Sequence, residues 1–373
     1  MKHFLLGVFS VALLASCSAQ WTPRALSDEA LEHALEAHFQ EREAQGFSGL
    51  VAIYAGDQRV YMSTHGYANR EQEQPITEST VFHLASVSKQ WTAAAILALV
   101  DAGQLSLQDT LETLFPESVL EKTRSETHQI TIHQLLTHSA GLEDFPVPCS
   151  QAEAGTLNRD RFLEQALQVP LKHPPGHQFS YSNGGYEILA AVIEITTEMT
   201  FEQALRHLFF EPLNLTDTGI SPERWDPNSI AIGYDQAGQP WGSLHSLFWG
   251  DEGPLWCNRG SGALLSTVAD LHRWLGALMN GERLSDWAWQ QKQTAHISEG
   301  AGASYGYGWS IYQTRQYREL GHTGSLNHIL EADVRLYPDT EVMIIVLGNS
   351  GEYPATEVLA PILPTIHQWM FNR

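Results

Sequence analysis

The sequence predicts an α/β (α+β) fold in which one antiparallel sheet takes strands from both ends of the chain, with a mostly helical segment inserted between them. Three observations predict this fold. Strand-like patterns occur near the N-terminus, over residues 47–67, and recur after residue 306. The middle, from about residue 105 to 300, holds helical segments broken by Pro and Gly. The chain of 373 residues exceeds what one small core organises, so we expect two halves.

The N-terminal part is predicted to form a helix, a hairpin and a buried helix. Residues 27–44 begin with Ser and two acidic residues, which suit the first turn of a helix. Strands at 47–54 and 60–67 flank a Gly-Asp turn at 56–57. Residues 91–100 are apolar nearly all round, which indicates a buried helix.

The C-terminal part is predicted to form strands followed by one helix. The expected strands are 309–313, 316–320, 328–337 and 341–347. A turn at 338–340 separates the last two strands. The final helix covers about 356–371, and Pro361 and Pro364 are expected to bend it or delay its start.

Ser86 and Lys89 lie three residues apart, directly before the buried helical run. Positions i and i+3 of a helix share one face, so the two side chains can touch. Serine is a weak nucleophile that needs an adjacent base, and a desolvated lysine amine can serve as that base. The helix N-terminus stabilises a developing anion and disfavours the ammonium form of Lys89. The plainer alternative is that Ser86 only caps the helix.

Two further short segments follow later in the chain. Tyr181-Ser-Asn183 precedes two glycines, and Gly321-His-Thr-Gly-Ser325 lies toward the C-terminal end. With Ser86-x-x-Lys89, in this order, they resemble the three-motif set of class C β-lactamases and their relatives: low-molecular-weight penicillin-binding proteins, D-aminopeptidases and related esterases. Further segments also resemble landmarks of this family, namely 131–142, 211–218, 260–270 and 305–309. The resemblance extends from about residue 47 to 350.

The resemblance implies a β-lactamase/transpeptidase-like fold, with a cleft where the two halves meet. Ser86 would attack a carbonyl and form an acyl-enzyme that water releases, with Lys89 as the base. Tyr181 would relay a proton to the leaving group and activate the deacylating water, and we expect the nearby ammonium to lower its pKa. Asn183 would hold Lys89 and a substrate amide oxygen. The backbone N–H groups of Ser86 and Ser325 would bind the oxyanion.

His322 departs from the Lys-Thr-Gly form of the third motif that dominates in true class C β-lactamases. Its ordinary pKa of about 6.5 leaves it mostly neutral at pH 7, so it offers less charge to a substrate carboxylate. Thr323 still offers a hydroxyl, and Gly324 permits close backbone approach. We expect His322, Thr323, Gly324 and Ser325 to bind substrate. The expected substrate is a D-amino-acid peptide, such as a peptidoglycan fragment, or a small ester or amide, and efficient β-lactam hydrolysis is not expected.

Two alternatives to a serine hydrolase of this kind stay open. The same scaffold would also suit a sensor that acylates slowly or not at all. Separately, Gly302-Ala-Ser304-Tyr-Gly306 matches the nucleophile elbow of α/β-hydrolases, although no apolar strand precedes it and no helix pattern follows. No cofactor and no metal are expected, because the sequence has neither a phosphate-binding glycine loop nor a metal-binding histidine spacing.

The first residues predict export. A basic start and an apolar run over residues 4–15 are typical of a secretory signal and too short to span a bilayer. The segment Leu14-Ala-Ser-Cys17 resembles a bacterial lipobox, in which Cys17 becomes the lipidated first residue. Cleavage after Ala19 without a lipid is the alternative. Ser18 resembles the outer-membrane sorting choice, which predicts a periplasmic lipoprotein of the bacterial cell envelope.

These expectations divide the chain into three parts. Residues 1–16 are a signal peptide, 17–25 a lipid-anchored linker and 26–373 a catalytic domain. Within the domain, the expected α/β half comprises 26–104 and 301–373, and the mostly helical half comprises 105–300.

The net charge of −22 limits the classes of partner that we expect. So acidic a chain is not expected to bind nucleic acid, and it would be repelled from anionic lipid. Membrane contact is therefore expected only through the anchor on Cys17, and the expected partner is a small-molecule or peptide substrate. The sequence does not set the oligomeric state. Cys149 and Cys257 lie in Pro/Gly-rich loops, and either a disulfide or two free buried cysteines stays open.

Overall fold

The structure, a computed structural model, describes residues 26–145, 157–221, 224–242, 249–250, 253–254, 256 and 258–371. Cys17 and the leader lie outside the described residues, as do Cys149 and Cys257. The signal peptide and the lipid anchor therefore stay predictions, and the choice between a disulfide and two free cysteines stays open. In the part of the chain that the structure describes, no helix is both long enough and apolar enough to cross a membrane.

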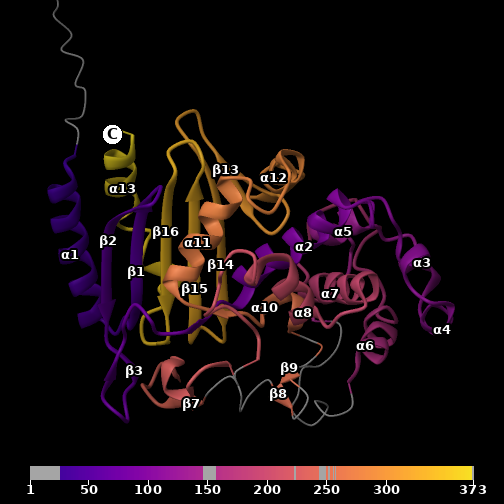
Figure 1. Ribbon diagram of the computed structural model, residues 1–373, viewed down its shortest axis with the longest axis horizontal. Coiled ribbons are helices and arrows are strands. Elements are labelled where there is room, and N and C mark those ends of the chain that lie inside the picture. Colours follow the sequence, from indigo (N-terminus) through magenta and orange to yellow (C-terminus); the bar gives the residue numbers. More distant parts are fainter. Residues whose placement is uncertain are drawn as a thin grey trace, which may run out of the picture.

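The centre of the fold is an eight-stranded antiparallel sheet in the order β11-β12-β13-β14-β15-β16-β1-β2 (Figure 1). Its strands are β11 (Ile297–Gly300), β12 (Ala303–Tyr305), β13 (Ser310–Gln313), β14 (Arg318–Leu326), β15 (Leu330–Tyr337), β16 (Val342–Gly348), β1 (Gly49–Ala55) and β2 (Gln58–His65). The two ends of the chain meet where β1 pairs with β16, with Gly49 opposite Gly348. The prediction of one sheet built from both ends is therefore confirmed.

Two terminal helices cover one face of the sheet. Helix α1 (Asp28–Ala44) begins at Ser27, whose hydroxyl accepts the N–H of Ala30 at 3.2 Å. Helix α13 (Leu363–Met370) has Pro364 in its first turn, where a missing N–H costs nothing. Both helices bury apolar side chains against alternate residues of β1 and β16 in one core.

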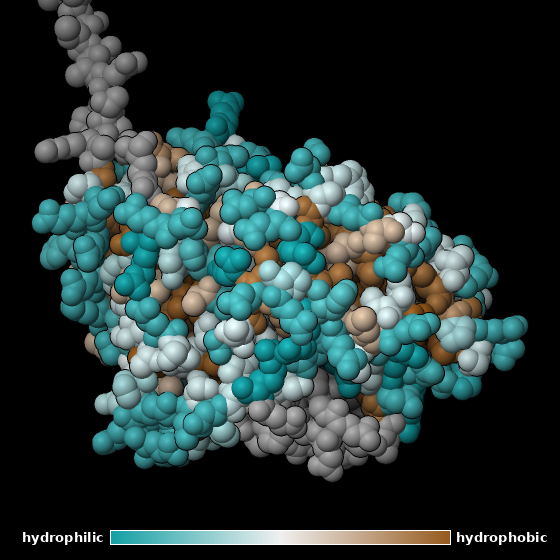
Figure 2. All heavy atoms as spheres, viewed as in Figure 1, coloured by the Kyte–Doolittle hydropathy of each residue, from teal (hydrophilic) through white to brown (hydrophobic). Residues whose placement is uncertain are grey.

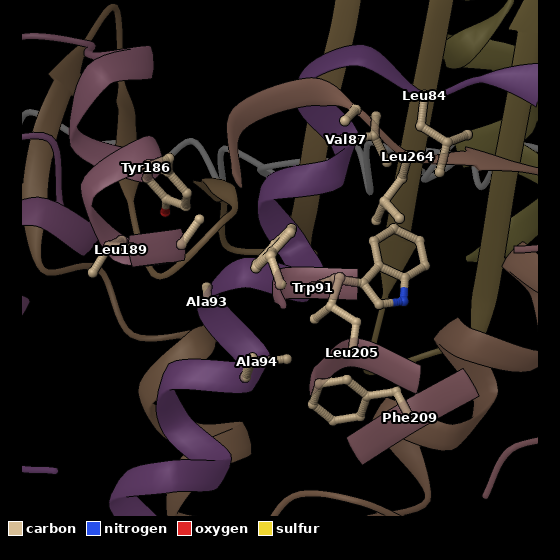
Figure 3. Close-up of a cluster of buried hydrophobic side chains, with 14 of the residues drawn as sticks. Leu84, Val87, Trp91, Ala93, Ala94, Tyr186, Leu189, Leu205, Phe209 and Leu264 are labelled. Carbon is tan, nitrogen blue, oxygen red and sulfur yellow. The ribbon is translucent and has the colours of Figure 1, made fainter. Parts of the chain in front are cut away.

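On the other face of the sheet, helix α11 (Val268–Met279) contacts β16, and helix α2 (Lys89–Asp101) belongs to the same hydrophobic core. On α11, His272 stacks on Tyr54 of β1, with ring centroids 3.9 Å apart. Figure 3 shows α2 between Tyr186 of α7 on one side and Phe209 on the other. Because apolar side chains surround α2 on all sides, its position in the fold is fixed by packing, and so is the position of the residues at its N-terminus.

The remaining helices form the helical half beside the sheet (Figure 1). They are α3 (Leu111–Leu114), α4 (Glu117–Leu120), α5 (Ile132–Leu136), α6 (Arg159–Ala166), α7 (Asn183–Thr197), α8 (Phe201–Leu205), α10 (Arg259–Gly262) and α12 (Asp286–Lys292). Four short strand pairs lie outside the large sheet: β3 (Tyr67–Asn69) with β4 (Gln74–Pro75), β5 (Phe82–His83) with β10 (Leu265–Ser266), β6 (Gly233–Tyr234) with β7 (Pro240–Gly242), and β8 (Trp249–Gly250) with β9 (Gly253–Pro254). The face seen in Figure 2 is largely hydrophilic, as expected for so acidic a chain.

Three details differ from the sequence-based expectations. The sheet begins with β11 at Ile297, before residue 301. Strand β14 runs on to Leu326 instead of ending near Leu320, because pairing with β15 continues to Leu326 opposite Leu330. Ser304 lies within β12, paired with β11 and β13, and not on a strand-to-helix turn. The α/β-hydrolase alternative is therefore wrong.

Candidate active site

Ser86 lies in a single 3-10 turn, Ala85–Ser88, between β5 and α2. The turn begins at Ala85 with φ at +45°, a left-handed conformation that residues other than glycine seldom adopt. The N-cap residue of this turn is Leu84, and that of α2 is Ser88. Neither side chain accepts a hydrogen bond from the described backbone N–H groups of the turn that it precedes. The alternative that Ser86 only caps the helix is therefore wrong, and its hydroxyl is available for other contacts.

Lys89 brings three parts of the chain together. Its Nζ lies 3.1 Å from Ser86 Oγ, 2.6 Å from Asn183 Oδ1 and 2.8 Å from the carbonyl oxygen of Ser261. An ammonium has three donors, and each of these three oxygens can accept one. The side chain is fully buried. The i, i+3 spacing thus places the serine hydroxyl and the lysine amine in contact, together with the amide of Asn183.

Burial lowers the pKa of Lys89 to about 7, and the negative charges of Glu187 and Asp144 oppose this shift. An ammonium out of water loses its hydration, so the neutral amine gains relative to the charged form. Near pH 7 a large fraction of Lys89 is therefore the neutral amine. A neutral amine 3.1 Å from Ser86 Oγ can accept the hydroxyl proton.

Glu187 is a buried acid that the sequence analysis did not single out. It lies on α7, and its carboxylate accepts the N–H groups of Gly260 and Ser261, both at 2.9 Å. Burial raises the pKa of Glu187 to about 7. By holding the backbone at 260–261, Glu187 fixes the carbonyl that Lys89 binds. Its signal in the sequence was an acidic residue within a mostly apolar helical segment.

Asn183 is oriented by Asp144, a second residue that the sequence analysis missed. The backbone N–H and the side-chain Nδ2 of Asn183 both donate to Asp144 Oδ1, at 2.9 and 2.8 Å. With Nδ2 held by the carboxylate, Oδ1 of Asn183 points to Lys89. Asn183 opens α7, whose N-cap is Ser182, so the amide sits at a fixed helix start.

Tyr181 lies beside this cluster, with its ring centroid 4.9 Å from Lys89 Nζ. The ring of His138 also stacks on the ring of Tyr181, with the two centroids 4.3 Å apart. Burial raises the pKa of Tyr181 above its ordinary value, although hydrogen bonding to Ser86 opposes the shift. The expectation of a lowered pKa is therefore wrong, because the loss of hydration outweighs any help from a nearby ammonium. At pH 7 Tyr181 is a neutral phenol, which can donate a proton.

His322 is buried behind Tyr181 and cannot offer a charge to a ligand at pH 7. Its Nδ1 lies 2.7 Å from the carbonyl oxygen of Thr323, and its Nε2 lies 3.0 Å from the hydroxyl of Tyr305. Nδ1 therefore carries the proton, and Nε2 accepts from Tyr305. Burial, followed by repulsion from Lys89, lowers the pKa of His322 to about 3. The structure thus makes His322 neutral, as its ordinary pKa suggested.

Gly324 brings the backbone of β14 against the serine. A Cβ on Gly324 would come within 2.2 Å of the carbonyl oxygen of Leu84 and 2.9 Å of the nitrogen of Ser86. The pairs between β13 and β14 extend only as far as Ser310 opposite Gly321. The backbone after Gly321, including that of Ser325, therefore lies along an edge beside Ser86.

Thr323 follows His322 on β14 and pairs with Asp333 of β15. Thr323 is exposed whereas His322 is buried, and both residues border a second cavity of about 400 Å³ together with Arg335. The role of Thr323 in binding substrate stays a prediction.

Ser86 opens into a cavity of about 270 Å³, bordered also by Asn183, Ser261 and Ser325. The structure thus brings together Ser86, Lys89, Tyr181, Asn183, His322 and Ser325, with Gly324 forming the close contact. Among the described residues, no group of three or more His, Cys, Asp or Glu side chains is arranged to hold a metal ion. The arrangement is a nucleophile with an adjacent base and a neutral acid, which suits acyl transfer.

Comparisons with known proteins agree with this chemistry. The family model described as Beta-lactamase matches residues 35–363. Protein flp of Staphylococcus aureus is 24% identical over 335 residues, which cover 88% of this chain and 64% of that protein. Penicillin-binding protein 4* of Bacillus subtilis is 25% identical over 348 residues, which cover 89% of this chain and 74% of that protein.

One solved structure with a similar fold is a penicillin-binding protein from Bacillus halodurans. It superposes with a TM-score of 0.74 at 26% identity, covering 88% of this chain and 98% of that one. The match covers 64% of the length of protein flp, so the activity of that whole protein is not assigned to this chain.

Proposed function

Because the chain belongs to the beta-lactamase family of serine hydrolases, we propose that it hydrolyses an amide or ester through an acyl-enzyme on Ser86. The proposed substrates are D-amino-acid peptides of the peptidoglycan type or small esters. One observation carries the proposal: the Nζ of Lys89, whose pKa burial lowers to about 7, lies 3.1 Å from Ser86 Oγ.

The proposed reaction has two steps. In the first, Lys89 takes the proton of Ser86, and Oγ bonds to the substrate carbonyl carbon while the N–H groups of Ser86 and Ser325 hold the oxyanion. The bond to the leaving group then breaks, and that group takes a proton from the phenol of Tyr181, which Lys89 restores. In the second step, Lys89 takes a proton from water, and the water oxygen bonds to the acyl carbon. The ester bond to Ser86 Oγ then breaks, and Lys89 returns the proton to Oγ.

Charge in the site favours substrates without a carboxylate next to the reacting bond. His322 is neutral, with its pKa lowered to about 3 by burial. The nearest guanidinium on the neighbouring strand, Arg335, is already held by Asp333 and Glu319, at 2.9 and 3.0 Å. Of the proposed substrates, a small neutral ester or amide therefore suits the site better than a peptide that ends in a carboxylate next to the reacting bond, and better than a penicillin does.

A second candidate function is a sensor that forms a long-lived acyl-enzyme. The raised pKa of Tyr181 favours it, because a neutral phenol cannot assist Lys89 in activating the deacylating water. The lifetime of the acyl-enzyme separates the two functions.

We also propose that the protein is a secreted lipoprotein, anchored through Cys17 in the outer membrane and facing the periplasm. The lipobox-like segment before Cys17 supports this. Labelling cells with a radioactive fatty acid tests it, since the label should attach to the wild type and not to Cys17→Ala. Equal labelling of the two proteins would contradict the anchor.

The hydrolase proposal is tested with p-nitrophenyl acetate, D-alanine p-nitroanilide and benzylpenicillin. We expect release of nitrophenol or nitroaniline from the first two, and slower consumption of the third. Ser86→Ala should lose at least about a thousandfold in kcat/KM. Ser304→Ala, a serine on β12 outside the site, is the matched control and should keep activity. Activity that survives in Ser86→Ala would contradict the proposal.

A further inference from the structure

Tyr181, the proton donor of the proposed reaction, lies on a segment with no regular secondary structure of its own. Residues 177–182 form neither helix nor strand, and α7 begins only at Asn183. A phenol that must meet a leaving group beside Ser86 needs a fixed backbone and a fixed ring. The contacts that fix Tyr181 therefore come from another part of the chain.

His138 makes such contacts on both sides of Tyr181 in the sequence. Its carbonyl oxygen accepts the N–H of Ser180 at 2.7 Å, and its Nδ1 accepts the N–H of Ser182 at 3.1 Å. Its ring stacks on the ring of Tyr181, with the centroids 4.3 Å and the planes 30° apart. One residue thus holds the backbone before and after Tyr181 as well as the aromatic ring itself.

The backbone of His138 has an uncommon conformation. The residue follows α5, and its φ of +53° lies in the left-handed region, which glycine or asparagine usually occupies after a helix. A histidine there has a conformational cost that glycine would avoid. Such a conformation persists where other contacts of the residue compensate for that cost. The hydrogen bonds to the backbone at 180 and 182 are contacts of this kind.

The imidazole of His138 is neutral. The residue is 1% exposed, and burial, followed by repulsion from Lys89, lowers its pKa well below the ordinary value. Because a backbone N–H can only donate, Nδ1 is the unprotonated nitrogen and Nε2 carries the proton. A nitrogen that already accepts the N–H of Ser182 is not free to take the proton of Ser86. His138 is therefore not a second base for the reaction.

Other aromatic rings keep this imidazole in place. Their centroids lie 4.9, 4.7 and 5.7 Å from that of His138, and they belong to Tyr186 of α7, Tyr305 of β12 and Phe179. In a close-packed interior, a ring with neighbours on several elements cannot tilt without displacing them. The ring that stacks on Tyr181 is thus itself held in one orientation.

We propose that His138 is a positioning residue that aims the phenol of Tyr181 at the leaving group. This proposal rests on the acyl-enzyme function proposed above, in which Tyr181 protonates the leaving group. Loss of the imidazole ring or of the Nδ1 acceptor lets Tyr181 move without removing its hydroxyl. Reactions that need a proton at the leaving group then slow more than reactions that do not.

The test compares two esters of acetic acid, which share the acyl group and differ in the leaving group. The ethoxide of ethyl acetate needs a proton to leave, whereas p-nitrophenolate leaves p-nitrophenyl acetate without one. The measured quantity is the ratio of kcat/KM for ethyl acetate to kcat/KM for p-nitrophenyl acetate. Release of acid is followed at constant pH, and the spontaneous hydrolysis of each ester is subtracted.

Two variants remove the two side-chain contacts one at a time. His138→Asn keeps an acceptor at the position of Nδ1 and suits a left-handed φ, but it loses the ring. His138→Phe keeps a ring and loses the acceptor. His272→Asn is the matched control, because His272 of α11 also stacks on a tyrosine, Tyr54 of β1, with the centroids 3.9 Å apart.

We expect the ratio to fall on the order of tenfold in His138→Asn and in His138→Phe, and to keep the wild-type value in His272→Asn. In a Tyr181→Phe background, which has no phenol to aim, neither change at His138 should lower the ratio further. A fall in one His138 variant alone assigns the positioning to the contact that this variant lacks. An unchanged ratio in both variants, or a fall of the same size in the Tyr181→Phe background, would overturn the proposal.

The wild type and Tyr181→Phe separate failure of this inference from failure of the proposed function. If the wild type hydrolyses neither ester, the acyl-enzyme function fails. If it hydrolyses only p-nitrophenyl acetate, or if Tyr181→Phe keeps the wild-type ratio, the acyl-enzyme stands and the role of His138 is refuted. A variant that is merely destabilised loses activity equally on both esters, so its ratio does not fall.

Discussion

Lys89 and Glu187 bind the same peptide backbone from two directions. Lys89 donates to the carbonyl oxygen of Ser261 at 2.8 Å, and Glu187 accepts the N–H of Ser261 at 2.9 Å. Both side chains are fully buried, and burial moves the pKa of each to about 7, downward for the lysine and upward for the acid. The protonation state of the base that activates Ser86 is therefore coupled to a carboxylate on another helix.

The acylation rate is expected to rise with pH as Lys89 loses its proton. Because the neutral amine is the base and its pKa lies at about 7, kcat/KM should increase through that pH and level off above it. Glu187→Gln should move this rise to lower pH, because the carboxylate raises the pKa of Lys89. The measurement is kcat/KM for p-nitrophenyl acetate against pH for both proteins. A rise that stays in place in Glu187→Gln contradicts the coupling.

A rise near pH 7 is also what an ordinary histidine would produce, so a histidine control is needed. His322 is not expected to be the source of the rise, because burial lowers its pKa to about 3. His322→Asn is therefore expected to change the height of the profile without moving its midpoint. A midpoint that disappears in His322→Asn would assign the titration to His322 instead of Lys89.

Tyr181→Phe is expected to impair the hydrolysis of amides more than that of activated esters. A neutral phenol can protonate an amine leaving group, whereas p-nitrophenolate leaves without a proton. We expect kcat/KM to fall roughly a hundredfold or more with D-alanine p-nitroanilide, and less with p-nitrophenyl acetate. Equal losses on the two substrates would show that Tyr181 does not act on the leaving group.

Gly324→Ala is expected to abolish activity by separating β14 from Ser86. The new Cβ would lie 2.2 Å from the carbonyl oxygen of Leu84, so the strand or the 3-10 turn must move. A displacement of about 1 Å is enough to cost on the order of a hundredfold in rate. Gly276→Ala on α11 is the matched control, since no described atom lies within 4 Å of its added Cβ.

Both glycine variants are measured for activity and for unfolding. Gly276→Ala should keep full activity and gain up to about 1 kcal/mol of stability, because alanine favours a helix interior. Normal activity in Gly324→Ala would mean that the contact between β14 and Ser86 is not needed.

Lys292 is a second fully buried lysine, and it should make stability depend on pH. Its Nζ donates to the carbonyl oxygens of Gln90 and Tyr307, at 3.0 and 3.1 Å, and burial lowers its pKa from 10.5 to about 7. Between these two values the unfolded chain binds a proton that the folded chain does not. The free energy of unfolding therefore rises with pH in this window, by up to about 1.4 kcal/mol per pH unit.

Lys292→Met removes that contribution. Chemical unfolding at several values from about pH 8 to 9.5 should give a shallower slope for Lys292→Met than for the wild type. Lys122→Met, at an exposed lysine paired with Glu164, should keep the wild-type slope. Parallel slopes for all three proteins would show that Lys292 keeps its proton when folded.

The hydrophobic pattern predicted the main features of the fold, and local spacing predicted the contact between Ser86 and Lys89, whereas the other site residues came from the family resemblance. The i, i+3 spacing of Ser86 and Lys89 places them in contact whatever surrounds them, because helix geometry alone sets the distance. The apolar runs of β1 and β16 indicate strands that are buried on both faces. A sheet with such strands lies between two layers of helices.

The missed features depend on contacts between segments that are distant in the sequence. Asp144 and Glu187 look like ordinary acids until folding brings them against Asn183 and Ser261. The pKa of Tyr181 depends on how completely its surroundings exclude water, which no local pattern states. The continuation of β14 past Leu320 depends on its pairing with β15, and the polar residues of this part of the strand show no hydrophobic pattern that predicts it.

The most direct test of the central claim is intact-mass spectrometry of the leaderless protein, quenched at intervals after mixing with p-nitrophenyl acetate. The account predicts an acetyl adduct on the wild type that maps to Ser86, is absent from Ser86→Ala and persists in Ser304→Ala. A short lifetime fits a hydrolase, and a long one fits the slowly deacylating sensor. An adduct of equal amount on Ser86→Ala, or hydrolysis that continues in that variant at the wild-type rate, would contradict the account.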